Sequence, residues 1–465
     1  MLWAENKKTS FTLYSKRLKS YLKERDVDAE IKWAQTADAV FTALTDPDPE
    51  FDVFITDIEM PNYDGTNTAK FLRTKNPKLP SIIISVHVGE IEIDNVLYRL
   101  KQANVIDGFF SHLQYSEWCE AVWRLVARRA PSILHLSDIH FGRFHALKRD
   151  LRIEDLISPA LDAINADGKV DLVVISGDLS SEGKRSELKQ ADKFLCHVRD
   201  VLGLGLEQFV IVPGNHDIVR SEESEDRFAT FIDFLNRFYG KLDDPTIVLR
   251  NFSALFESEN KQLGLEHVSH IEESLHSLFI FDDVKTVVIG MNSVISSDQE
   301  RWNLSEIQPQ QLIAISEELN NLPPHQAEYF RIAVLHHNLF VVPSFTGDGE
   351  PERAVRNQGL ILHHLIANRV KLILHGHTHY SIGYKYLPFF LGRSNATANP
   401  IHVFGTGTMS GEETTKAQSY FHMTVIRCDL DDKGRVNTAK VIPYRLVDDA
   451  LPWEMVNPIS ISFDA

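Results

Sequence analysis

Residues 210–217 read VIVPGNHD: an apolar run stops at Pro213 and Gly214 and places Asn215, His216 and Asp217 in a row. A β-rich run that ends in a glycine turn is typical of a strand followed by a loop. Taken alone, such a stretch would most often hold a helix cap and a partly buried histidine. The rest of the chain, however, repeats the pattern.

Four other apolar runs end in side chains that can bind a metal. The runs are SILHLSDIH, VDLVVISGD, RIAVLHH and VKLILHGHTH, and they deliver Asp138, His140, Asp178, His336, His337, His377 and His379. Parallel strands collect ligands at their carboxyl ends, so the five endings can converge on one site. Nitrogen and oxygen donors without sulfur favour borderline divalent ions such as Mn, Fe, Zn or Co.

Length and composition indicate a soluble chain of two or three domains. The 465 residues are 43% hydrophobic and 24% charged, and no apolar run approaches the roughly 18 residues that a membrane span requires. The start, MLWAENKKTS, lacks the apolar core of a signal peptide. Three scattered cysteines fit a reducing compartment. We therefore expect a cytoplasmic protein with no membrane partner.

The chain is acidic, with a formal net charge of −17, and most of the excess negative charge follows Ala130. An acidic body repels the nucleic-acid backbone unless a basic patch or bound metal offsets it. We find no Lys/Arg cluster of that size. Long nucleic acid is therefore not an expected partner.

Residues 1–130 alternate between strand and helix patterns. Strands are expected at 1–4, 29–34, 51–57, 81–86 and 105–110, and helices at 11–24, 38–44, 66–74, 91–102 and 116–129. Ser116 is the expected N-cap of the last helix, which ends at Arg128 and Arg129. Five such units predict a doubly wound α/β domain. Pro131 cannot extend the last helix, so the domain boundary falls near it.

The stretch FDVFITDIEMPNYDG resembles the third strand and following loop of a two-component receiver domain. The resemblance implies a flavodoxin-like fold, Mg²⁺ binding, and Asp57 as phosphoacceptor for a histidine kinase or other phosphodonor. Ser85 matches the hydroxyl that senses the phosphate. Two departures are present: the acidic pair of the family stands here as Glu5 and Asn6, and its lysine as His112, which is charged only part of the time. The alternative is a degenerate receiver that serves docking or dimerisation, so an oligomer could form through this domain.

The ordered motifs D-x-H, G-D, G-N-H-[DE], H and G-H-x-H resemble the calcineurin-like metallophosphoesterase superfamily over residues 133–446. The resemblance implies an α/β/β/α sandwich of four layers over 131–450 and two divalent ions, with Mn, Fe or Zn expected. One ion would take Asp138, His140, Asp178 and His379. The other would take Asp178, Asn215, His336 and His377. His337 would then support the site or face the substrate.

The chemistry implied by this resemblance needs two ions about 3.5–4 Å apart that hold phosphate oxygens and activate a water molecule. His216, next to the ligand Asn215, would protonate the leaving group. Asp217 could either orient His216 or cap the next helix.

The remaining segments carry weaker signals. Residues 218–275 are charged and helix-like, and could form packing helices or a lid over the substrate. A strand is expected within 284–294, with Asn292 and Ser293 near the site, and residues 296–319 resemble the class III cyclic nucleotide phosphodiesterase branch. A strand within 402–411 and a hairpin turning at 431–434 should complete a second sheet, and 451–465 should be a short tail.

These observations predict a receiver-like domain fused to a dimetal phosphoesterase that hydrolyses a phosphodiester, a nucleotide or cyclic nucleotide. The retained His140 and the lack of a G-D-x-x-D-R-G pattern argue against a phosphoprotein phosphatase. Two alternatives stay open. One is a metal-dependent nuclease, and the other is a signalling adaptor whose receiver docks a partner while hydrolysis is secondary.

Overall fold

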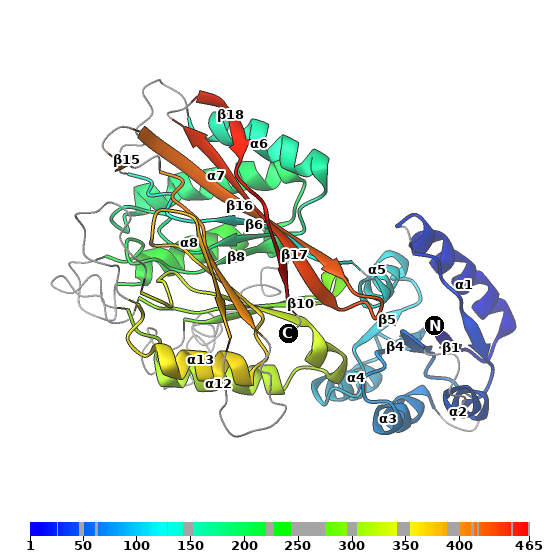
Figure 1. Cartoon of the computed structure of the whole chain (residues 1–465). Helices are drawn as coiled ribbons and strands as arrows, with labels where there is room; N and C mark the ends of the chain where they lie inside the picture. Colours follow the sequence, from blue (N-terminus) through cyan, green and yellow to red (C-terminus); the bar gives the residue numbers. More distant parts are fainter. Residues whose placement is uncertain are drawn as a thin grey trace. The chain divides into compact units, whose positions relative to one another are not determined.

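The computed structural model describes residues 1–25, 27–45, 51–60, 64–127, 129–142, 152–219, 227–242, 275–294, 305–341, 354–387, 400–410, 413–415, 418–447 and 450–463 (Figure 1). The chain forms two compact units. The first is Met1–Arg129 with the short segments Phe281–Lys285 and Asn320–Tyr329, and the second holds the rest of the chain. No helix in the described ranges combines the length and apolar character needed to cross a membrane.

The first unit contains a parallel sheet of five strands in the order β2-β1-β3-β4-β5. The strands are β1 (Leu2–Ala4), β2 (Lys32–Ala34), β3 (Phe54–Thr56), β4 (Ser81–Ser85) and β5 (Gly108–Ser111). The helices are α1 (Lys8–Lys23), α2 (Ala37–Thr45), α3 (Gly65–Lys75), α4 (Ile91–Gln102) and α5 (Tyr115–Val126). The predicted doubly wound domain is confirmed.

Alternation along the strands sorts the apolar side chains onto two faces of this sheet. Trp3 packs with Leu18 of α1 and Trp118 of α5, whereas Phe54 packs with Leu72 of α3 on the other face. Successive strand residues point to opposite faces, which is why both faces are covered by helices.

One helix boundary differs from the prediction. Helix α5 begins at Tyr115 with Gln114 in the N-cap position, so Ser116 lies in the first turn and the prediction of Ser116 as N-cap is wrong. The Gln114 side chain accepts a hydrogen bond from the Ser111 amide at 2.8 Å, which closes the turn between β5 and α5. Arg128, expected at the helix end, lies outside the described residues.

The second unit contains two sheets (Figure 1). The six-stranded sheet has the order β13-β14-β12-β11-β10-β9, with bounds β9 (Ser277–Phe281), β10 (Thr286–Gly290), β11 (Phe330–Val334), β12 (Leu372–His375), β13 (Ile382–Tyr386) and β14 (Ile401–Gly405). The eight-stranded sheet follows the path β18-β17-β16-β6-β7-β8, and β15 and β19 pair with β16 and β17. Its bounds are β6 (Ser132–Leu136), β7 (Leu172–Ile175), β8 (Phe209–Ile211), β15 (Glu413–Thr415), β16 (Gln418–Leu430), β17 (Val436–Val447), β18 (Ala450–Met455) and β19 (Ile459–Ser462).

Helices cover the outer faces of the two sheets, in agreement with the predicted four layers. The sheets contact each other through β8 and β10, and Figure 1 shows α6 and α7 on one side of the pair and α12 and α13 on the other. The helices are α6 (Ile153–Asp167), α7 (Arg185–Leu202), α8 (Ala229–Tyr239), α12 (Pro309–Asn320) and α13 (Gln358–Ala367), with the short 3₁₀ turn η1 (Leu206–Gln208). The 3₁₀ turns η2 (Asp282–Val284) and η3 (Pro324–Glu328) belong to the two short segments of the first unit. The expected insertion at 218–275 lies mostly outside the described residues, which there include α8.

The C-terminal region differs from the prediction in two ways. The hairpin β16–β17 turns at Asp431 and Gly434 as expected, but β16 pairs with β6 and so joins the sheet of the first three motifs. The tail expected at 451–465 is instead built into that sheet, since β18 and β19 both pair with β17.

Candidate metal centre

The predicted site residues lie at the carboxyl ends of strands from both sheets. Asp138 and His140 follow β6, Asp178 follows β7 and Asn215 follows β8, all in the eight-stranded sheet. The second sheet supplies the other three residues, His336 after β11 and His377 and His379 after β12. Ligand-binding side chains collect at the carboxyl ends of parallel strands, and here the carboxyl ends of strands from two sheets meet at one site.

Five of the candidate ligands have a left-handed backbone. Their φ angles are positive, between 53° and 67°, at Asp138, His140, Asp178, His377 and His379. This conformation costs of order 1–3 kcal/mol for a residue with a Cβ and clusters at functional sites. The loops are therefore shaped to aim side chains rather than to minimise local energy.

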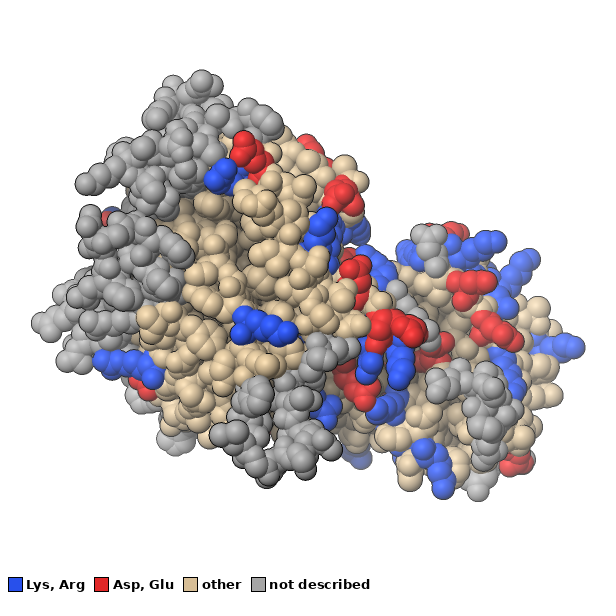
Figure 2. Space-filling view, viewed as in Figure 1, with Lys and Arg blue, Asp and Glu red and all other residues tan. Residues whose placement is uncertain are grey.

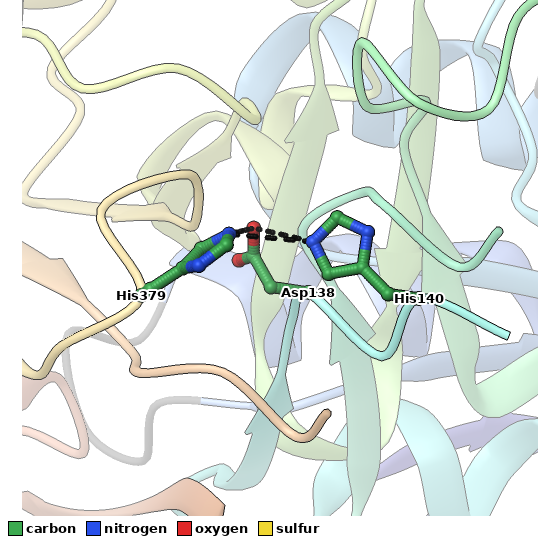
Figure 3. Close-up of side chains that lie close together, drawn as sticks. All are labelled: Asp138, His140 and His379. Atoms are coloured by element: carbon green, nitrogen blue, oxygen red, sulfur yellow. Dashed lines mark hydrogen bonds and ion pairs between the residues drawn. The ribbon is translucent and has the colours of Figure 1, made fainter. Parts of the chain in front are cut away.

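Asp138, His140 and His379 form the first group of ligand atoms (Figure 3). Asp138 Oδ1 lies 3.3 Å from His379 Nε2 and 3.9 Å from His140 Nε2. The two imidazole Nε2 atoms are 3.3 Å apart. Burial lowers the pKa of His140 to about 4, so its ring is neutral near pH 7 and can offer a lone pair.

Asp178, His336 and Asn215 form the second group. His336 Nε2 lies 3.3 Å from Asp178 Oδ2 and 2.9 Å from Asn215 Oδ1. The same Asp178 Oδ2 lies 3.7 Å from His140 Nε2, so one carboxylate oxygen faces both groups. Burial alone would lower the pKa of His336, but the Asp178 carboxylate outweighs burial and raises this pKa to about 9.

His337 and His377 differ in their surroundings. His337 Nδ1 lies 2.9 Å from the Ser293 hydroxyl. The main-chain amide of His377 donates to Asp138 Oδ2 at 3.0 Å, and its ring lies 5.2 Å from that of His336. Within the described residues the His377 ring does not join a group of three ligand atoms.

His216 lies beside both groups, with its ring 4.9 Å from that of His140. Its main-chain amide donates to Asp178 Oδ1 at 2.8 Å, and its Nδ1 hydrogen-bonds to the Ser181 carbonyl, also at 2.8 Å. The loop after β7, which holds Asp178 and Ser181, therefore fixes the position of His216.

Asp217 lies between the loop after β7 and the loop after β8. Its carboxylate accepts hydrogen bonds from the amide and hydroxyl of Ser180, at 2.8 and 2.9 Å, and from the Gly214 amide at 2.9 Å. Burial and the Asp178 charge raise the pKa of Asp217 to about 7. Asp217 thus ties the loop after β7 to the loop after β8.

The motif glycines are required because the loops pass close to one another. A Cβ on Gly376 would lie 1.9 Å from Ser137 Oγ and 2.6 Å from Asp138 Oδ2. A Cβ on Gly177 would lie 2.6 Å from His336 Nδ1, and φ there is +93°. Only glycine permits this packing without displacing a candidate ligand.

Several residues that support the site have no signal in the sequence. The Ser176 carbonyl accepts a hydrogen bond from His336 Nδ1 at 2.7 Å, and the Thr408 hydroxyl donates to the Asp138 carbonyl, also at 2.7 Å. Thr408 comes from the glycine-rich turn after β14, which the sequence indicates only as a turn. Main-chain contacts between distant segments are not encoded in any local pattern.

The donor set fits divalent cations. Asp138 Oδ1 is buried and has no hydrogen-bond partner among the described residues, and it faces imidazole nitrogens. Burial would raise the pKa of Asp138, yet the surrounding histidines hold it below its usual range. A buried, ionised carboxylate beside imidazole nitrogens is stabilised by a metal ion, and mixed N and O donors suit Mn, Fe, Co or Zn.

The predicted receiver pocket lies at the carboxyl ends of strands in the first unit. Glu5, Asp57 and His112 each offer a ligand atom, all within 4.8 Å of one another. Asn6 Nδ2 donates to the Glu59 carbonyl at 2.7 Å. Ser85, at the end of β4, is buried.

Comparisons with known proteins match both parts of the chain. Residues 131–381 match the family model Calcineurin-like phosphoesterase, and residues 12–103 match Response regulator receiver domain. A search of curated proteins finds no match.

Among solved structures, similarity extends to a purple acid phosphatase from yellow lupin (Lupinus luteus) seeds, at 10% identity and TM-score 0.42. The match covers 73% of this chain and 55% of the lupin chain, so this chain spans about half of that protein. A Francisella response regulator receiver domain matches at 24% identity and TM-score 0.22, covering 27% of this chain and 93% of its own. The regulator TrrA from Thermotoga maritima, in complex with Mg²⁺-BeF, matches at 19% identity and TM-score 0.21, covering 27% and 96%.

The match over 131–381 covers more than half of the chain, and the receiver match lies N-terminal to it. The chain belongs to the calcineurin-like phosphoesterase family.

Proposed function

We propose that this chain is a dimetal phosphodiesterase whose substrate is a small phosphodiester such as a nucleotide or cyclic nucleotide. One observation carries the proposal: Asp178 Oδ2 lies 3.7 Å from His140 Nε2 and 3.3 Å from His336 Nε2. A carboxylate between two sets of donors is suited to bridging two ions.

We assign the candidate ligands to two ions and proton donation to His216. Asp138, His140, Asp178 and His379 would hold one ion, and Asp178, Asn215, His336 and His377 would hold the other. When bound, the ions would neutralise phosphoryl oxygens and supply an activated water molecule. The Ser181 carbonyl fixes Nδ1 of His216, so proton donation to the leaving oxygen falls to Nε2.

Hydrolysis of bis-p-nitrophenyl phosphate in the presence of Mn²⁺ tests this proposal. The Asp178→Asn variant should lose at least about 100-fold in kcat/KM, because residues that act as a unit in catalysis carry large effects. Asp155→Asn, an exposed change on α6, is the control and should retain the wild-type rate. Wild-type protein that shows no turnover with Mn, Fe, Co or Zn would rule the enzyme out and leave the adaptor hypothesis.

A substrate panel separates the classes of phosphodiester. Cyclic nucleotides should be cleaved in preference to p-nitrophenyl phosphate, a monoester, and to long nucleic acid on a gel. On the face shown in Figure 2, the Lys and Arg side chains in the described part of the second unit are scattered and form no patch. Rapid cleavage of long DNA or RNA would instead favour the nuclease hypothesis.

The receiver domain suggests a second role, control of hydrolysis by phosphorylation. Asp57 follows β3 directly and lies in the cluster with Glu5 and His112, as a phosphoacceptor would. Incubation with acetyl phosphate should change the turnover of wild-type protein and leave Asp57→Ala unchanged. Equal rates for phosphorylated and untreated wild-type protein would exclude this control.

A further inference from the structure

The cluster in the first unit consists of two buried carboxylates and one partly exposed imidazole. Glu5 follows β1, Asp57 follows β3 and His112 follows β5, three strands of one parallel sheet. One ligand atom from each lies within 4.8 Å of the others. Glu5 is 1% exposed and Asp57 is 7% exposed, so neither carboxylate is a solvated surface group.

Two buried carboxylates this close together need positive charge. Main-chain amides supply part of the compensation: Lys7 N donates to Glu5 Oε1 at 2.9 Å, and Ile58 N donates to Asp57 Oδ1 at 2.7 Å. Each of these bonds reaches one oxygen of its carboxylate. A bound cation would stabilise both carboxylates.

His112 is arranged as a ligand and poorly suited to serve as a fixed positive charge. An imidazole carries a positive charge only part of the time near pH 7, and its neutral form offers a lone pair to a metal ion. The His112 ring packs on Tyr14, with the two ring centroids 4.7 Å apart.

The donor set does not match the preference of Mg²⁺. Mg²⁺ favours oxygen ligands in octahedral geometry, whereas this pocket offers an imidazole at one of its three positions. Asn6, which stands where the receiver family has its second carboxylate, uses its amide nitrogen on the Glu59 carbonyl. Imidazole together with carboxylates suits borderline ions such as Zn²⁺, Co²⁺ or Mn²⁺.

We propose that Glu5, Asp57 and His112 form a binding site for a borderline divalent metal ion, in place of the Mg²⁺ site that the receiver resemblance implies. The site is additional to the phosphoesterase centre and does not depend on that centre being active. The receiver domain would then respond to the availability of such an ion, whether or not Asp57 is phosphorylated.

Metal counting on the full chain tests the proposal. Asp138→Asn and Asp178→Asn are introduced together to weaken the phosphoesterase centre, and Co²⁺ binding is measured by equilibrium dialysis and visible absorption. In this background, His112→Ala and Glu5→Gln should each weaken one Co²⁺ site by at least about tenfold. His197→Ala, a change in α7 whose ring contacts the Ser158 hydroxyl, is the matched control and should leave Co²⁺ binding unchanged.

His112→Lys provides the second variant. It restores the cation typical of the receiver family, removes the imidazole ligand, and keeps the test valid if His112→Ala fails to fold. We expect it to abolish the preference for Co²⁺ over Mg²⁺. Unchanged Co²⁺ affinity in His112→Lys, or equal affinity of the unsubstituted pocket for Mg²⁺ and Co²⁺, would overturn the proposal.

Discussion

At the scale of single residues, the fixed ring of His216 leads to a prediction about leaving groups. His216→Ala should lower kcat for a cyclic nucleotide by about 10²–10⁴, because an alkoxide leaving group needs a proton. The effect on bis-p-nitrophenyl phosphate should be much smaller, since p-nitrophenolate departs without one. Steady-state kinetics on both substrates measures the difference.

The comparison between substrates also serves as the control for His216. A substitution that merely disturbed the nearby ligands would slow both substrates equally, which would contradict a role as general acid. The Mn²⁺ content of the variant, measured by elemental analysis, should equal that of the wild type.

Two glycines allow a matched test of loop packing. Gly376→Ala places a methyl group 1.9 Å from Ser137 Oγ, so it should destabilise the fold by about 1–3 kcal/mol and reduce metal binding. Gly359, in helix α13, has open space around it, so Gly359→Ala should stabilise by about 0.5–1 kcal/mol. Urea unfolding measures the change in the free energy of unfolding for each variant, and the two changes should have opposite signs. Equal changes would show that the space around each glycine does not decide the effect of the added methyl group.

The residues that could be predicted from the sequence are those whose strands deliver them directly. His336 could be placed because it follows the end of β11 after Leu335, and Asp178 because it follows the end of β7 after Ser176 and Gly177. The role of Asp217 could not, because its partners Ser180 and Gly214 lie on two loops that meet only in the folded chain. Thr408 was missed for the same reason, since its hydrogen bond to Asp138 spans most of the second unit's sequence.

At the scale of elements, a buried ion pair joins helix α3 to the sheet of the first unit. Arg73 Nη2 lies 2.8 Å from Asp107 Oδ2, which also accepts the Ser81 amide at 2.6 Å. Burial alone would raise the pKa of Asp107, but His325, 3.1 Å away in the same unit, and Arg73 outweigh burial and lower it. A lowered folded-state pKa means that stability is present above the unfolded-state value and is lost as pH falls through the folded-state value.

The first unit should therefore lose stability in acid partly through Asp107. Asp107→Asn should flatten the dependence of the unfolding free energy on pH below about 4, where the unfolded carboxyl begins to take up a proton. Arg73→Ala should destabilise the fold at pH 7 by up to about 3 kcal/mol, because it removes one of the charged partners of a buried carboxylate. Unfolding curves that keep the wild-type slope in Asp107→Asn would contradict this account.

The elements themselves were predicted best where the pattern is local. The five βα units of the first domain follow from alternating periods of apolar residues, and α4 has the predicted bounds of 91–102. The pairing of β16 with β6 could not be predicted, because antiparallel partners nearly 300 residues apart share no periodic signal. The strands β18 and β19 pair with β17, and no local pattern in 451–465 indicates that pairing.

At the scale of the whole molecule, metal binding and folding should be coupled. Ions that bind only the native state stabilise it by about 2.7 kcal/mol at 100 times Kd. Five candidate ligands with a left-handed backbone make the coupling stronger, because the ions offset their conformational cost. Chelation should therefore lower Tm, and Mn²⁺ should restore it. A Tm unchanged by chelation in protein shown to have lost its metal would contradict the coupling.

The position of β16 has a consequence for where this protein can be shortened. The family match ends at residue 381, yet β16 covers the long edge of β6, and Arg427 reaches the Ile164 carbonyl of α6 at 2.7 Å. A chain truncated at 381 would expose β6, the strand that carries Asp138 and His140, as an unpaired edge that invites aggregation. We expect that fragment to be insoluble on expression, and the fragment that continues to residue 463 to be monodisperse by gel filtration.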